Sequence, residues 1–170
     1  GYPAVEIDDT SFTAAADKLY SEGFGMSILW DRSKKIDEFI TMVLSHIEAS
    51  LYISRSTGKF VLKLIRADYT VGSLTQLNES NINRIESFKR RTTVELTNQV
   101  SVVFWDASTG ENNSITVQDT ALIQQIGTTI GTSRQYPGIT NATIASKVAS
   151  RDLMSLSTPL ASCTIYANRA

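Results

Sequence analysis

Residues 34–69 constrain the fold more than any other segment, because an amphipathic helix there runs directly into a strand–turn–strand unit. The helix has one apolar stripe at the i, i+3, i+4 spacing, formed by Ile36, Phe39, Ile40, Val43, Leu44 and Ile47. Residues 51–54 and 59–66 read as strands, and Gly58 allows a turn between them. The segment therefore predicts a helix followed by an antiparallel hairpin, whose residues build the fold and include none that does chemistry.

Weaker signals predict further elements on both sides of this unit. They include a helix over 10–21, a strand over 26–30, a Ser33 cap on the second helix, and a long strand or bent pair over 84–97. They also include strands over 99–105, 114–117, 131–136 and 163–167, a short helix from Asp119 to Gly127, and a helix from Asn141 or Thr143 to about 155. Alternate residues of the 99–105 strand are apolar on both faces, so we expect both faces to be covered.

Helices interspersed with short, hairpin-like strands favour an α+β fold over a parallel α/β sheet, with antiparallel sheets and about four helices. Residues 72–81 are polar and rich in turn formers, which makes this segment the best boundary between lobes. We therefore expect a helix–hairpin lobe over 1–71 and a second α+β lobe over 82–170.

Composition excludes several classes of protein. Sixteen basic and seventeen acidic residues leave a net charge of −1, which argues against specific nucleic-acid binding. The one dense basic cluster, Lys89, Arg90 and Arg91, is expected at a solvated strand end or an interface rim, with phosphate binding as the alternative. No apolar run is long enough to span a membrane. The single cysteine, Cys163, cannot form an intramolecular disulfide and is expected to be buried in its strand.

Groups that do chemistry are scarce. The only histidine, His46, falls at the flank of the buried face of its helix, where we expect a boundary histidine without a catalytic role. One histidine and one cysteine argue against a zinc site, and no G-x-S-x-G elbow is present. The acidic pairs Asp8-Asp9 and Asp37-Glu38 suit helix starts. The sequence therefore predicts no catalytic, cofactor-binding or metal-ligating residue, and no cofactor.

Four residues are candidates for structural or interaction roles: Trp30, Trp105, Tyr136 and Asp152. Asp152 lies within the apolar arc of the 141–155 helix, so its carboxylate must find partners. We expect it to pair with an arginine or to cap a backbone turn, and the alternative is that it fixes a contact between lobes or subunits. For the aromatic residues, core packing is the default and interface contact the alternative.

Several short motifs recur in the order that they have in one known family. They are Ile28-Leu29-Trp30-Asp31, Asp37-Glu38-Phe39-Ile40, Thr57-Gly58-Lys59-Phe60, Leu64-Ile65-Arg66-Ala67-Asp68-Tyr69, Thr97-Asn98-Gln99-Val100, Gln118-Asp119, Tyr136-Pro137-Gly138-Ile139 and Arg151-Asp152-Leu153. In this order the chain resembles the tail-hub and tail-tip proteins of tailed bacteriophages. That family contains the host-specificity protein of lambda-like phages and its prophage relatives.

The resemblance implies a piece of a longer, multi-domain protein with β-rich, hub-like lobes and no enzymatic activity. Such a protein forms a homotrimeric ring in the virion tail, where its partners are the tube and the central spike or fibre. It would lie in the bacterial cytoplasm before assembly, and the isolated piece is expected to be monomeric. Two alternatives remain open at this point: a receptor-binding, adhesin-like module of the tail tip, and a peptidoglycan hydrolase piece that uses acids such as Asp8 or Asp68.

Overall fold

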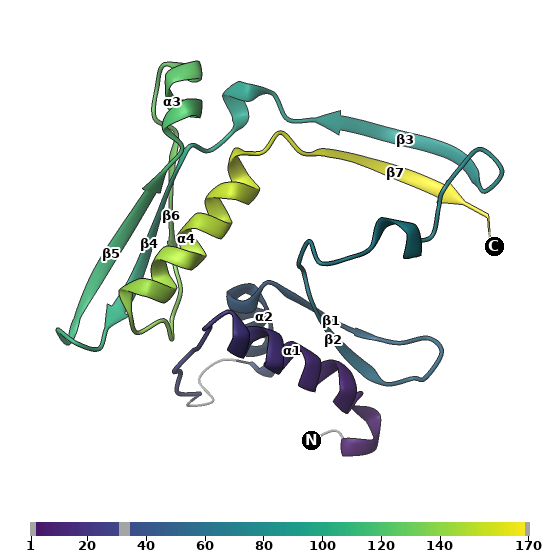
Figure 1. The fold of residues 1–170 in the computed structure, drawn as a ribbon, viewed down its shortest axis with the longest axis horizontal. Coiled ribbons are helices and arrows are strands. Elements are labelled where there is room, and N and C mark those ends of the chain that lie inside the picture. Colours follow the sequence, from purple (N-terminus) through teal and green to yellow (C-terminus); the bar gives the residue numbers. More distant parts are fainter. Residues whose placement is uncertain (1–2, 31–34, 169–170) are drawn as a thin grey trace.

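The computed structural model describes residues 3–30 and 35–168, and it has the predicted α+β fold (Figure 1). Its described strands form a two-stranded sheet β1–β2, a two-stranded sheet β3–β7, and a three-stranded sheet in the order β5–β4–β6. A short 3-10 turn at Ala4–Glu6 precedes the first helix, and two others, at Val71–Ser73 and Thr93–Glu95, lie in the segments that connect the sheets. None of the described helices combines the length and apolar character that crossing a bilayer requires.

The helix–hairpin unit forms as predicted. Helix α1 spans Asp9–Ser21 and helix α2 spans Ile36–Ile47. Strands β1 (Ala49–Ile53) and β2 (Phe60–Leu64) pair antiparallel. Helix α2 passes directly into β1 because Glu48 adopts a left-handed backbone conformation, with φ of 51°. The predicted cap Ser33 lies outside the described residues.

The prediction of a strand over 26–30 is wrong. This segment has no regular secondary structure, and it is tied to a distant turn by one backbone hydrogen bond, in which the Ser27 N–H donates to the Gly138 carbonyl at 2.8 Å. One such contact does not make the repeated ladder that defines a strand. The segment instead packs against that turn.

The main core lies between helix α4 (Ala142–Ser157) and one face of the three-stranded sheet. Strand β4 (Gln99–Asp106) is central, with β5 (Glu111–Gln118) antiparallel to it and β6 (Gly131–Gln135) parallel. The core residues include Val100, Val102, Phe104, Tyr136, Ile139, Ala145, Val148 and Ala149. The opposite face is open, because Trp105 is 51% exposed there, so the expectation that both faces are covered is wrong.

The ends of the two helices in this part follow local sequence rules. The Asp119 carboxylate accepts a hydrogen bond from the Leu122 N–H at 3.0 Å, and α3 (Thr120–Ile126) ends at Gly127 with φ of 81°. The Asn141 side chain accepts from the Ile144 N–H at 2.9 Å at the start of α4. The Asp119 cap was predicted, and Asn141 was one of the two residues expected to start the later helix; each cap satisfies a backbone donor that the helix itself leaves unpaired.

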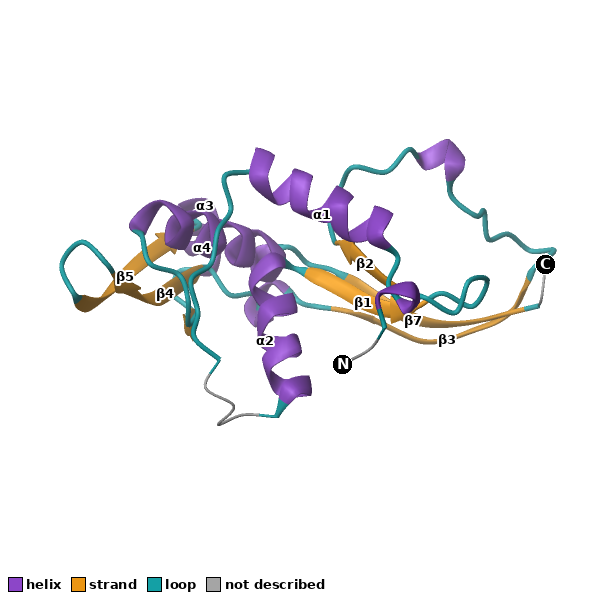
Figure 2. Ribbon diagram, turned by 90° about the horizontal axis from the view of Figure 1, so that it is seen from below, coloured by secondary structure: helices purple, strands orange, loops and turns teal. Residues whose placement is uncertain are grey.

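Strands β3 (Ile82–Arg90) and β7 (Ala161–Ala167) form a long antiparallel ribbon that projects from the core (Figures 1 and 2). The predicted strand or bent pair over 84–97 is shorter, because a capping box between Thr92 and Glu95 starts a 3-10 turn. Cys163 is exposed on β7, so its predicted burial is wrong. A ribbon of two strands has no third layer that could cover such a residue.

Candidate functional site: the polar junction around Asp152

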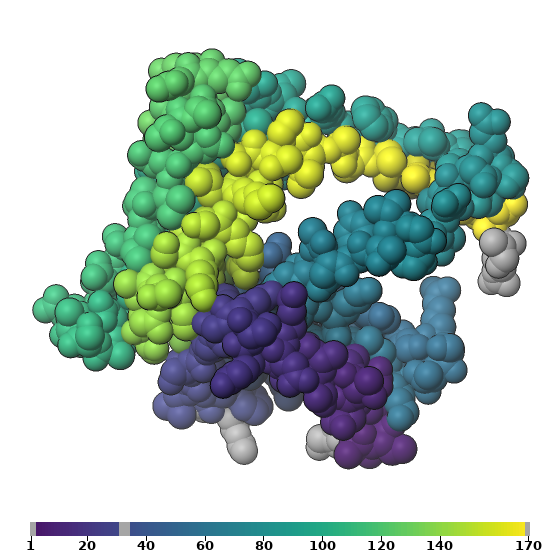
Figure 3. All heavy atoms as spheres, in the orientation of Figure 1, coloured from purple at the N-terminus to yellow at the C-terminus, as the bar shows by residue number. Residues whose placement is uncertain are grey.

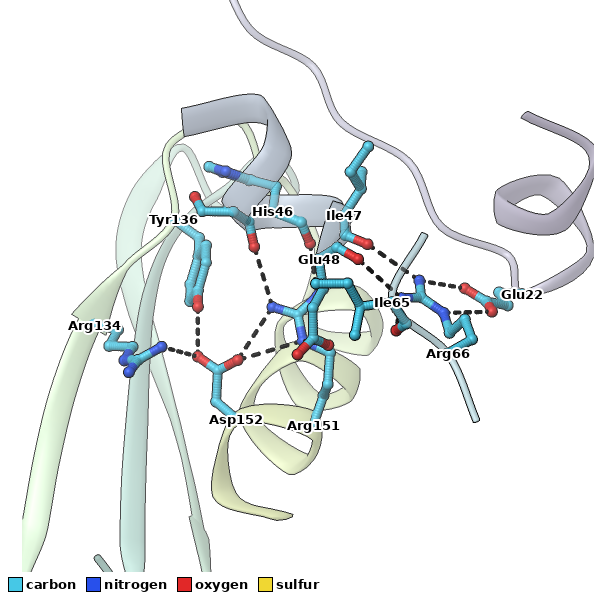
Figure 4. Close-up of polar contacts among 11 residues, drawn as sticks. Glu22, His46, Ile47, Glu48, Ile65, Arg66, Arg134, Tyr136, Arg151 and Asp152 are labelled. Carbon is cyan, nitrogen blue, oxygen red and sulfur yellow. Dashed lines mark hydrogen bonds and ion pairs between the residues drawn. The ribbon is translucent and has the colours of Figure 1, made fainter. Parts of the chain in front are cut away.

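The carboxylate of Asp152 is the centre of a buried polar cluster (Figure 4). It accepts hydrogen bonds from the Tyr136 hydroxyl, from Arg134 Nη1 at 3.1 Å and from Arg151 Nη2 at 3.1 Å. Burial, together with the hydrogen bond to Asp152, raises the pKa of Tyr136, so the phenol stays protonated and donates. The apolar face of α4 thus tolerates a carboxylate because β6 and the residue after it supply donors.

Arg151 connects this cluster to helix α2. Its Nη1 donates to the His46 carbonyl at 2.7 Å, and its Nε lies 3.2 Å from a carboxylate oxygen of Glu48. The last carbonyls of a helix carry partial negative charge and lack intrahelical donors. One guanidinium therefore satisfies the C-terminus of α2 and the Asp152 carboxylate together, and joins segments that are far apart in the sequence.

His46 is buried between the same elements, with 1% of its surface exposed. Its Nδ1 lies 2.7 Å from the Met42 carbonyl oxygen and its Nε2 lies 2.5 Å from the Pro137 carbonyl oxygen. Its ring meets the Tyr136 ring edge-on at 5.1 Å. The expected boundary position is therefore wrong, because the turn after β6 covers the side chain completely. Both ring nitrogens face backbone oxygens, so this histidine has a structural environment.

A further ion pair, between Glu22 and Arg66, completes what we call the polar junction. Its other members are His46, Glu48, Arg134, Tyr136, Arg151 and Asp152 (Figure 4). Arg66 makes a bidentate pair with Glu22, with both N···O distances 2.9 Å, and it also donates to the Ile47 carbonyl at 3.2 Å. Lys147 of α4 donates to the backbone oxygen of Glu22 at 2.7 Å. The end of α1, the end of α2 and α4 are thus held together through side-chain-to-backbone bonds.

The Glu22–Arg66 pair predicts a pH-dependent contribution to stability. The hydrogen bonds from Arg66 lower the pKa of Glu22 below its ordinary value of 4.5 in the folded chain. A lowered carboxyl pKa adds stability above the unfolded pKa, and this contribution is lost as the pH falls through the folded pKa. We expect Glu22→Gln to lower the free energy of unfolding by about 1–2 kcal/mol at neutral pH, and the deficit to shrink below about pH 4.5.

Urea unfolding of both chains at a series of pH values measures this difference. Glu79→Gln is the matched control, because Glu79 is exposed and lies in the segment between β2 and β3. It should change the free energy of unfolding at neutral pH by less than about 0.5 kcal/mol. A Glu22→Gln deficit that stays constant from neutral to acidic pH would contradict the assignment.

A cavity of about 440 Å³ opens beside the cluster, with Leu44, Glu48, Arg134, Arg151 and Leu156 among its lining residues. In the described part of the chain, every buried side-chain nitrogen and oxygen has a hydrogen-bond partner. No three of the described His, Cys, Asp and Glu side chains gather as a metal site would require. The polar groups of this cluster therefore bind one another and connect the elements that carry them.

The structure brings two of the four candidate residues together, Tyr136 and Asp152. Trp30 lies elsewhere, stacked on Phe39 with ring centroids 5.4 Å apart, and Trp105 lies on the open sheet face. Sequence reasoning assigned no partner role to the arginines of the junction, Arg66, Arg134 and Arg151. Arg66 and Arg134 bind partners on other elements, and Arg151 joins its neighbour Asp152 to the distant His46 carbonyl, so a local pattern does not reveal the contacts between elements.

Comparison with known proteins gave one family. A family model described as "Putative phage tail protein" matches residues 35–169, which span α2 to β7 and include every member of the junction except Glu22. A search of curated proteins found no match.

Proposed function

Because the chain belongs to this family of phage tail proteins, we propose that it is a structural, non-enzymatic module of the tail hub or tip. In this role it joins the tail tube to the central spike or fibre, as part of a ring around the channel through which DNA leaves. The observation that carries the proposal is the family match, which spans most of the chain. The resemblance of the sequence motifs to hub and tip proteins supports the narrower assignment to the hub or tip of the tail.

The contacts of the polar junction support a structural role for the chain. Its ionisable side chains contact one another and backbone carbonyls, and these contacts connect α1 and α2 to α4. Polar networks in which every member is satisfied hold elements in one arrangement. A component that connects other proteins requires such a fixed arrangement of its parts.

We further propose that residues 1–71 and 82–170 form two lobes, with the junction as their contact. Residues 70–80 are exposed and have no strand or α-helix, which is typical of a connecting segment. Limited proteolysis should therefore cut first within 72–81, for example after Leu74 or Leu77, and leave two fragments that stay associated. First cuts inside α4 or β4 would contradict this division.

The proposed function is tested in a phage or prophage that lacks the gene for this chain. We expect DNA-filled heads without joined, functional tails, and rescue by the full-length protein supplied in trans. An antibody against the chain should label the end of the tail tube in electron micrographs. Labelling of distal fibres, or binding of the purified protein to host cells, would support the adhesin-like alternative. Peptidoglycan clearance lost on changing Asp8 or Asp68 would support the hydrolase.

A further inference from the structure

The chain exposes far more surface than a compact monomer of its mass. Its accessible surface is 12037 Å² for 18.7 kDa. The area–mass relation of folded monomers gives roughly 8,300 Å² for this mass, an excess of about 3,700 Å². Standard protein interfaces bury about 800 Å² on each partner, so the excess leaves room for contacts on two sides of the molecule.

Much of this surface belongs to the β3–β7 ribbon with Arg91 and Asn168, which we call the arm (residues 82–91 and 161–168). Every residue of β7 is exposed. Ile85 and Ile165, a directly opposed pair on one face, are 56% and 39% exposed, and Phe88 is 69% exposed. An isolated two-stranded ribbon is marginally stable in water, and apolar residues on it call for a covering surface. Figure 3 shows an opening on the inner side of the arm.

The edges of the arm are also unpaired by any described strand, because β3 and β7 pair only with each other. The register shifts between Glu86 and Lys89, so Ser87 and Phe88 both stand opposite Cys163, and Ser87 has a φ of 54°. Such a bulge bends a ribbon and turns one side chain away from the ladder. Phe88 is therefore displayed at the bend.

Charge distinguishes the arm from the rest of the chain. The arm has four basic residues and one acidic residue, Arg84, Lys89, Arg90, Arg91 and Glu86, for a net charge of +3. The remaining residues include twelve basic and sixteen acidic ones, for a net charge of −4 within the total of −1. A basic arm and an acidic body on the same polypeptide are complementary between copies.

We propose that the arm packs on the acidic body of a second copy of this chain. The contact is head to tail, because the arm of one copy meets a different surface on the next, and such contacts close into rings when the rotation allows. That this contact is the one between subunits of the hub ring rests on the proposed function. The exposed area, the apolar residues and the charge of the arm support the contact itself, which differs from the expectation of a monomeric piece.

The molar mass of the 170-residue chain tests the proposal, measured by sedimentation equilibrium from micromolar to millimolar concentration at low salt. We expect the mass to rise with concentration. Phe88→Ser should weaken association at least about tenfold, because an exposed aromatic anchor is lost. Tyr20→Ser is the matched control: Tyr20 is 87% exposed but lies outside the arm, and the change should leave the association unaltered.

A second pair of variants isolates the charge. Lys89→Glu with Arg90→Glu should weaken association by at least about tenfold, whereas Arg55→Glu with Lys63→Glu changes the net charge equally but makes the body more acidic, and it should leave association as strong or stronger. Alkylation of Cys163, which is exposed on the arm of a single copy, should slow as concentration rises. The proposal is overturned if the mass stays at 18.7 kDa throughout the concentration range, or if the substitutions in the arm leave association unchanged. Either result leaves the proposed function standing, because rescue of the deletion tests that separately.

Discussion

Replacing Asp152 by alanine should lower the free energy of unfolding by about 3 kcal/mol, because removing one member of a buried charge pair leaves its partners uncompensated. Asp152 is 5% exposed and accepts from Tyr136, Arg134 and Arg151. The Tyr136 hydroxyl donates to Asp152, so the substitution would leave this hydroxyl buried without its acceptor. The Arg134 side chain is 44% exposed and can turn to water, which places the expected loss at the lower end of the range for broken buried pairs.

Urea unfolding followed by circular dichroism measures this loss. Asp68→Ala is the control, because Asp68 is also paired with a cation, Lys18, but at 3.9 Å and with 58% of its side chain exposed. A solvent-exposed pair of this kind contributes less than about 1 kcal/mol. If the free energies of unfolding of Asp152→Ala and Asp68→Ala differ by less than about 0.5 kcal/mol, the cluster does not hold the elements together as described.

Sequence reasoning identified the elements whose signals are local. The apolar stripe of α2 and the turn at Gly58 predicted the helix and hairpin. The side chain of Asp119 predicted one helix start, and Asn141 was one of two residues predicted to start another. Each of these features depends on residues within a few positions of one another. A local pattern is sufficient to recognise them because the physical cause is itself local.

The features that sequence reasoning missed depend on distant partners. Residues 26–30 are mostly apolar and were predicted as a strand, but their neighbour is the turn at Gly138 and none of the described strands pairs with them. Strand β6 pairs parallel to β4, which no hairpin loop signals. His46 is buried because that same turn closes over its ring. The presence of Asp152 on an apolar face predicted a need for partners, whereas their identity required the fold.

Gly138→Ala should also cost about 3 kcal/mol, because an added methyl group meets both backbone strain and a crowded neighbour. Gly138 has φ of +93°, a conformation that residues with a Cβ rarely adopt. The new Cβ would lie 2.9 Å from Met26 Cγ, 3.1 Å from the Ser27 carbonyl oxygen and 3.2 Å from Ile28 Cβ. The Ser27 oxygen cannot retreat freely, because the Ser27 N–H is bonded to the Gly138 carbonyl at 2.8 Å.

Gly58→Ala separates these two contributions. Gly58 also has a positive φ, of +70°, but a Cβ there would meet nothing within 4 Å. Its alanine variant should therefore lose only the backbone term, about 1 kcal/mol. The difference between the two variants, measured by urea unfolding, reports how strongly residues 26–28 resist a methyl group on the turn that also covers His46. Equal losses at the two glycines would show that the added methyl group meets no such resistance, and that residues 26–28 do not pack closely on this turn.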